Sequence, residues 1–132
     1  MIVVDSSALI AILEKEDDAV RYAAAIAQAE RLLVSAMNVH ETGMVLRVRR
    51  GPAAVARMWH FLQHDNDFEI VPFDEVQVRE ALDAFDRFGK GMQAQARLNL
   101  ADCAAYALAR TMKAPLLFKG DDFSATDVRS CL

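Results

Sequence analysis

Four acidic residues stand where an α/β chain would bring their side chains together: Asp5, Glu41, Asp102 and Asp122. Asp5 and Asp122 each follow an apolar run of the strand type, and the other two acids fall in early turns of helical patterns. In an open parallel sheet, the carboxyl ends of the strands and the adjoining helix starts border one crevice. Carboxylates in one crevice repel one another unless protons or cations intervene. Because oxygen ligands of this kind suit Mg²⁺ or Mn²⁺, the pattern predicts a metal-dependent enzyme that cleaves phosphodiester bonds.

The elements that must position these acids alternate along the chain. Apolar runs predict strands at residues 2–4, 32–34, 68–71 and 116–118, and Val128 is a candidate start for a short edge strand. Helical patterns fall at residues 8–13, 17–30, 52–64, 74–88 and 99–112, and one more begins at Ser35 or Asn38 and ends before Gly51. Strands that alternate with helices predict an α/β fold: a parallel sheet of about four to five strands, covered by helices on both faces. We expect one domain over residues 1–132.

Within the helix predicted at residues 74–88, the large apolar side chains fall at spacings of four and three. They are Val78, Leu82, Phe85 and Phe88. This spacing predicts one apolar stripe, which we expect to be the buried face of that helix.

The composition is that of a globular domain with an acidic balance. Apolar residues make up 54% of the 132 residues, which excludes general disorder. The 15 lysines and arginines against 19 acids give a formal charge of −4, so no overall basic footprint indicates nucleic-acid binding, although a local basic rim stays compatible with this total. Two cysteines are too few for a disulfide framework or a thiolate zinc site. With no export signal and no apolar run of about 20 residues, we expect a cytoplasmic protein with no membrane partner.

Each acid also has a structural interpretation as a helix cap. Asp5 precedes a helix, and Asp102 stands three residues after Asn99, which is the spacing of a capping box. Glu41 stands at the same spacing from Asn38. Taken singly, each acid suits a cap better than a metal ligand. Four acids at four element ends in an apolar scaffold favour a shared site.

Other chemistries fit less well. Ser6 and Ser7 lack the glycine-flanked elbow of a serine nucleophile. His60 and His64 share a helix face but lack the glutamate of a zinc protease motif, so we interpret them as surface residues. A receiver-like phosphorylation switch would use a lysine such as Lys119, but it requires paired acids after the first strand and an acid at the end of the third.

A basic cluster lies in the last turn of the helix predicted to carry Glu41. Arg47, Arg49 and Arg50 can complement the dipole at the helix C-terminus, or they can form a phosphate-binding rim beside the acids. The two interpretations are compatible, and both remain open.

Taken together, these residues resemble the PIN-domain family, and within it the VapC-type toxins of bacterial type II toxin–antitoxin pairs. The resemblance covers essentially the whole chain. It is carried by residues 3–8, 38–41, 98–109, 116–123 and 126–128. The order and spacing of these stretches make the combination specific.

The resemblance implies a PIN fold, an endoribonuclease that depends on Mg²⁺ or Mn²⁺, inhibition by a small VapB-type antitoxin, and a homodimer. Operator DNA would be bound only through the antitoxin. The family's acidic quartet falls on Asp5, Glu41, Asp102 and Asp122, and Asp121 competes for the fourth place. Ser7 matches the small polar residue that supports the first aspartate, and Thr126 is a further supporting candidate. A metal-activated water would leave 5′-phosphate and 3′-hydroxyl ends; whether one ion or two act stays open.

One stretch departs from the family pattern. Gly89, Lys90 and Gly91 match, and Lys90 is a candidate RNA contact, but residues 92–96 lack the arginine and histidine that relatives often carry there. The departure bears on RNA affinity or target choice. It leaves a further hypothesis open, in which the chain is a catalytically weak module that acts mainly by binding an antitoxin and, as a complex, operator DNA.

Overall fold

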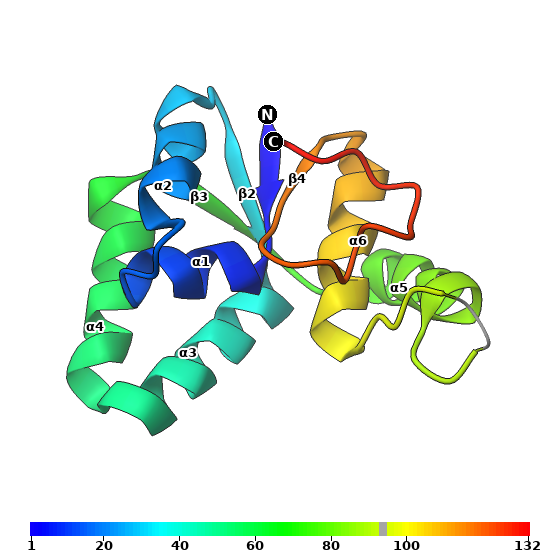
Figure 1. Ribbon diagram of the computed structural model, residues 1–132, viewed down its shortest axis with the longest axis horizontal. Helices are drawn as coiled ribbons and strands as arrows, with labels where there is room; N and C mark the ends of the chain where they lie inside the picture. Colours follow the sequence, from blue (N-terminus) through cyan, green and yellow to red (C-terminus); the bar gives the residue numbers. More distant parts are fainter. Residues whose placement is uncertain (93–94) are drawn as a thin grey trace.

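The computed structural model describes residues 1–92 and 95–132 (Figure 1). The strands are β1 (Ile2–Val4), β2 (Leu32–Ser35), β3 (Phe68–Val71) and β4 (Leu116–Leu117). The helices are α1 (Ser6–Leu13), α2 (Ala19–Gln28), α3 (Ala36–Arg50), α4 (Pro52–His60), α5 (Glu75–Phe88) and α6 (Leu100–Met112). A single π-helical segment, η1 (Phe61–Asp65), continues α4, so the helix predicted at residues 52–64 changes its hydrogen-bonding pattern near its end. No helix of these described ranges has the length and apolarity to cross a membrane.

The four strands form one parallel sheet in the order β3-β2-β1-β4, which confirms the predicted α/β class. The predicted edge strand near Val128 is reduced to a single bridge between Ser130 and Leu116. The chain adds β2 and β3 on one side of β1 and then crosses over to add β4 on the other side. The carboxyl ends of β1 and β4 therefore meet at a topological switch point, where α/β sheets form their binding crevices.

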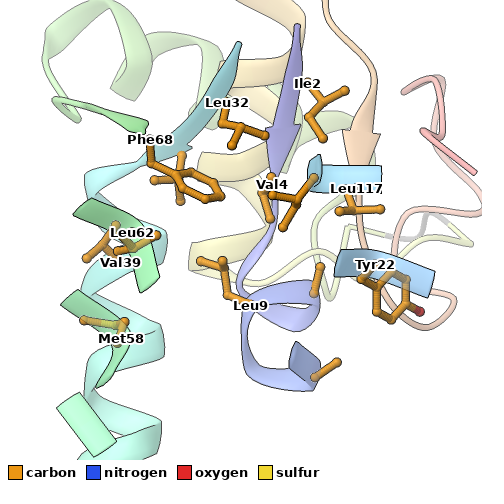
Figure 2. Close-up of a cluster of buried hydrophobic side chains, with 14 of the residues drawn as sticks. Ile2, Val4, Leu9, Tyr22, Leu32, Val39, Met58, Leu62, Phe68 and Leu117 are labelled. Carbon is orange, nitrogen blue, oxygen red and sulfur yellow. The ribbon is translucent and has the colours of Figure 1, made fainter. Parts of the chain in front are cut away.

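Two hydrophobic clusters cover the two faces of the sheet. Alternate residues of a strand point to opposite faces. Accordingly, Ile2 and Val4 pack in one cluster with α1, α2, α4 and η1, whereas Val3 packs in the other with α5 and α6. Figure 2 shows the first cluster, in which Leu9 of α1 lies next to the end of β1 and Met58 of α4 lies farther from the sheet, beside α3. The burial of β1 on both faces explains why its sequence is apolar throughout.

The buried face of α5 differs from the predicted apolar stripe. Ala81 and Ala84 are buried against α6, whereas Leu82 is 61% exposed and Phe85 is 37% exposed. The facing side of α6 is also rich in buried alanines. Small side chains let the two helices approach closely, so Leu82 and Phe85 remain outside, while Phe88 at the end of α5 packs against the cluster. The prediction that Leu82 and Phe85 face the core was therefore wrong.

Candidate active site

The four predicted acids come from four segments that end or begin at the carboxyl edge of the sheet. Asp5 follows β1, Glu41 lies in the second turn of α3, Asp102 lies in the first turn of α6, and Asp122 lies beyond β4. In Figure 1, α1, α3 and α6 all begin at the lower end of the sheet, where β1 terminates. Asp5 and Asp102 are buried at 3% and 8% exposure, while Glu41 is half-buried and Asp122 is exposed.

Asp5 is held in one orientation by Ser7. Its Oδ2 accepts hydrogen bonds from the Ser7 backbone N–H at 3.0 Å and from the Ser7 Oγ at 2.6 Å, so Asp5 is also the N-cap of α1. The Ser7 Oγ accepts in turn from the backbone N–H of Lys119 at 2.9 Å. This chain of contacts links the segment after β4 to the carboxylate after β1.

Asp102 serves as a cap and faces the other acids at the same time. Its Oδ2 accepts from the Asn99 backbone N–H at 3.0 Å, and its own backbone N–H donates to the Asn99 Oδ1 at 2.9 Å. The capping box predicted for α6 is therefore confirmed. The prediction of a capping box formed by Asn38 and Glu41 at α3 is wrong, because Ser35 caps that helix and Asn38 lies inside its first turn. Glu41 is thus free of a capping role.

Burial and mutual repulsion raise the pKa values of the two buried acids. Burial raises the pKa of Asp5 to about 6; the hydrogen bonds from Ser7 oppose this rise, and the charge of Glu41 adds to it. Burial, together with the charges of Asp5, Asp122 and Glu41, raises the pKa of Asp102 to about 7, against the opposing hydrogen bond from the Asn99 backbone. The four acids are therefore electrostatically coupled, and a bound cation would reduce the repulsion among their charges.

The electrostatics also distinguish the two candidates for the fourth acid. Asp121 and Asp122 are both exposed on the turn that begins at Gly120, whose φ of 90° favours glycine. The charge of Asp122 raises the pKa of Asp102. This coupling favours Asp122 as the fourth acid.

The remaining predicted residues lie around this site or away from it. Thr126 closes a turn, donating from Oγ1 to the Phe123 backbone oxygen at 2.7 Å. Arg49 and Arg50 form ion pairs with Glu14 at 2.9 and 3.4 Å, at the far end of α3 from Asp5. Arg47 and Lys90 are exposed, and their contacts with RNA remain predictions. Within the divergent stretch at 92–96, Gln93 and Ala94 lie outside the described residues.

Two alternative sites are not supported by the geometry. His60 and His64 are exposed and stack on each other with ring centroids 5.0 Å apart, as expected for surface residues. The ammonium group of Lys119 pairs with Glu16 rather than with Asp5. Across residues 1–92 and 95–132, no three histidine, cysteine, aspartate or glutamate side chains lie close enough together to form a ready-made metal site, so the four acids are coupled through their charges without being set in ligand geometry.

One polar residue at the site was missed in the sequence. Asn38 is fully buried, and its Nδ2 lies 3.4 Å from the Asp5 Oδ1. Its position three residues before Glu41 indicated a cap, and no pattern in the sequence distinguishes a capping asparagine from one buried beside an aspartate.

Comparison with known proteins identifies the class to which this fold and site belong. A model of the PIN domain matches residues 2–129. The chain therefore belongs to the PIN-domain family.

The similarity is closer to one group within that family. The chain is 43% identical over 130 residues to ribonuclease VapC28 of Mycobacterium tuberculosis, and the alignment covers 98% of this chain and 97% of the relative. It is 37% identical over 126 residues to ribonuclease VapC30 of the same organism, covering 96% of this chain and 95% of the relative. The resemblance to VapC-type proteins is confirmed by these relatives.

Solved structures support the same fold. VapC20 of Mycobacterium tuberculosis, described as a toxin that cleaves the sarcin–ricin loop, superposes with a TM-score of 0.79 at 18% identity, covering 97% of this chain and 96% of that one. VapBC2 of Rickettsia felis, solved with a fragment of its promoter DNA, superposes with a TM-score of 0.74 at 14% identity, covering 98% and 97% of the two chains.

Proposed function

We propose that this protein is the ribonuclease toxin of a toxin–antitoxin pair and that its RNA cleavage depends on Mg²⁺ or Mn²⁺. Its similarity to VapC ribonucleases over nearly the whole chain supports an RNA-cleaving hydrolase. The observation that carries the metal dependence is the electrostatic coupling of two buried acids, Asp5 and Asp102, with Glu41 and Asp122. Such a cluster is costly in a protein unless it binds a cation.

The donor set suits a hard divalent cation. All four side chains offer carboxylate oxygens, which Mg²⁺ and Mn²⁺ prefer, and the cysteines do not belong to the cluster. Because no three such side chains converge among the described residues, Asp5, Glu41 and Asp102 would have to move toward the ion to hold it, directly or through water, with Asp122 at the outer rim. A bound divalent ion would lower the pKa of a coordinated water and stabilise charge on the scissile phosphate.

The protein's own contribution is to orient two of the acids, Asp5 and Asp102, before the substrate arrives. Ser7 fixes the Asp5 Oδ2, and the capping box leaves the Asp102 Oδ1 available while it engages Oδ2. The N-terminus of α6 also points its positive dipole end toward the site, which favours anionic groups there. These features support in-line attack by water on a phosphodiester, which would leave 5′-phosphate and 3′-hydroxyl ends.

We further propose that the antitoxin binds an apolar groove between α3 and α4. The groove has a volume of about 820 Å³, and its apolar lining includes Met44, Val48 and Trp59, which are 55%, 86% and 41% exposed. Its ionisable lining residues, among those described, are His40 and Arg47. An amphipathic helix with acidic residues at its flank would complement such a surface.

We also propose that the protein forms a homodimer and that RNA is its substrate. It would bind operator DNA only through the antitoxin. The exposed side chains of Leu82 and Phe85 give α5 an apolar face that supports self-association. Exposed Arg47 and Lys90 support phosphate contacts by the RNA.

The function is tested by cleavage of a pool of small RNAs with purified, antitoxin-free protein in Mg²⁺, in Mn²⁺ and in EDTA. We expect discrete fragments with 5′-phosphates, and we expect EDTA and Asp102→Asn each to abolish them. Equal cleavage in EDTA would contradict the metal dependence. No cleavage at any metal concentration by folded protein would favour the catalytically weak, antitoxin-binding module instead.

A further inference from the structure

The side chain of Asn38 lies where the segments that carry the buried acids meet. It is 0% exposed in the first turn of α3. Its Nδ2 lies 2.8 Å from the Ser6 Oγ, 3.1 Å from the backbone oxygen of Ala101 and 3.4 Å from the Asp5 Oδ1. One amide group therefore contacts the acid after β1, the start of α1 and the residue next to Asp102.

The backbone of Asn38 is held as firmly as its side chain. Its carbonyl oxygen accepts from the Ser6 Oγ at 3.3 Å and from the buried Thr42 Oγ1 at 2.8 Å. Because Ser6 and Asn38 contact each other through two hydrogen bonds, the starts of α1 and α3 are joined at this point. These hydrogen bonds fix the backbone of Asn38 in the position from which its side chain contacts Asp5.

The amide is asymmetric in its surroundings. Three oxygen atoms surround Nδ2, whereas the buried Oδ1 forms no hydrogen bond within the described part of the chain. An unpaired buried carbonyl lowers stability, and such costs are concentrated at functional sites. A neutral amide can donate to a carboxylate without adding a further negative charge to the four already present.

Resting on the proposed metal-dependent function, we infer that Asn38 is a positioning residue for the metal site. It contacts Oδ1 of Asp5, the carboxylate oxygen that Ser7 does not bond, and connects that carboxylate to the first turn of α6. It acts through Asp5 and Asp102 and does not touch the substrate. Partners that orient metal ligands typically change metal affinity by about 10- to 100-fold when they are lost.

The test compares Asn38→Leu with Gln77→Leu. Gln77 is a matched control, since it is also a buried amide with an unpaired side-chain oxygen, and its Nε2 donates to Thr111 at the far end of α6 from Asp102. Each variant and the wild type is titrated with Mn²⁺ by isothermal calorimetry, and its unfolding is followed in urea. Asn38→Ser is the second variant, because its shorter side chain removes the contact with Asp5 but keeps a polar group.

We expect both leucine variants to change the unfolding midpoint, and we expect only the Asn38 variants to weaken Mn²⁺ binding, by about 10- to 100-fold. Wild-type Mn²⁺ affinity in folded Asn38→Leu or Asn38→Ser would overturn the inference and leave the metal site standing. Equal weakening in Gln77→Leu would overturn it as well, because the effect would then be general. A wild type that binds no Mn²⁺ would overturn both the metal site and the inference.

Discussion

The hydroxyl of Ser7 and the backbone N–H of Lys119 form a hydrogen bond of 2.9 Å between residues 112 positions apart in the sequence. The same hydroxyl donates to Asp5 at 2.6 Å. The carboxylate after the first strand is thus oriented by a group whose own position depends on the last strand. The orientation of the Asp5 carboxylate therefore depends on the packing of both β1 and β4.

Removal of this hydroxyl should affect stability and activity together. In Ser7→Ala, the Lys119 N–H loses its acceptor and Asp5 loses one of its two donors from Ser7. We expect unfolding free energy to fall by about 1–2 kcal/mol and RNA cleavage to fall about 10-fold. Urea unfolding and initial cleavage rates measure the two effects. Ser130→Ala is the control, since Ser130 is exposed and its hydroxyl, within the described residues, bonds to the backbone of Leu132; an equal loss there would refute the explanation.

Neutralisation of Asp5 should separate stability from activity. Its pKa of about 6 in the folded protein, against an ordinary value of 3.8, means that the charged form is disfavoured by folding. Asp5→Asn should therefore stabilise the metal-free protein at pH 7.5, by roughly 1–3 kcal/mol, while it abolishes cleavage. Urea unfolding in EDTA and cleavage in Mg²⁺ are the two measurements. A destabilised variant, or one with undiminished activity, would contradict this assignment.

The same shift predicts a pH dependence. Between about pH 4 and 7, the folded protein retains protons on Asp5 and Asp102 that the unfolded chain has already released, so these acids lower stability as the pH rises through this window. Asp127 has a lowered pKa, chiefly through its hydrogen bond with Tyr106, so the stability that it contributes is lost only as the pH falls below about 4, outside this window. The difference between wild type and Asp5→Asn isolates the Asp5 contribution. We expect the stabilisation by Asp5→Asn to be larger at pH 7.5 than at pH 4; an unchanged difference would disprove the shift.

The fourth acid can be assigned by a pair of neighbouring substitutions. Because the charge of Asp122 reaches Asp102, Asp122→Asn should lower cleavage about 10-fold or more. Asp121→Asn removes the same charge from the same turn, and we expect it to stay within about twofold of the wild type. Initial cleavage rates at saturating Mg²⁺ measure both. The reverse order would assign the role to Asp121.

The proposed antitoxin groove has its own test. Met44→Glu places a negative charge on the groove wall, and we expect it to weaken antitoxin binding at least about 10-fold, through lost apolar contact and repulsion of an acidic partner. Val76→Glu is the control on α5, across the sheet, where Val76 is 61% exposed. Calorimetric titration with the antitoxin measures both. Unchanged affinity in Met44→Glu would place the antitoxin elsewhere.

Much of this site follows from position in the chain, and the remainder depends on packing. The strand order brings Asp5 and Asp122 to one edge, as their places after apolar runs predicted. The role of Asn38 could not be predicted, because its contacts are with residues more than 30 positions away. The exposed face of α5 could not be predicted either. Its orientation is decided by the close approach of alanines on two helices rather than by the apolar periodicity of Leu82 and Phe85.

The place of β1 in the sheet has a consequence for folding during synthesis. β1, at residues 2–4, is translated well before β4, at residues 116–117, although the two strands are neighbours in the sheet. Asp122 and the Lys119 N–H that anchors Ser7 arrive with it. A nascent chain that still lacks this stretch has an incomplete sheet and an incomplete set of acids. The sheet and the candidate active site are therefore completed together, and only after residues from both parts of the chain have been synthesised.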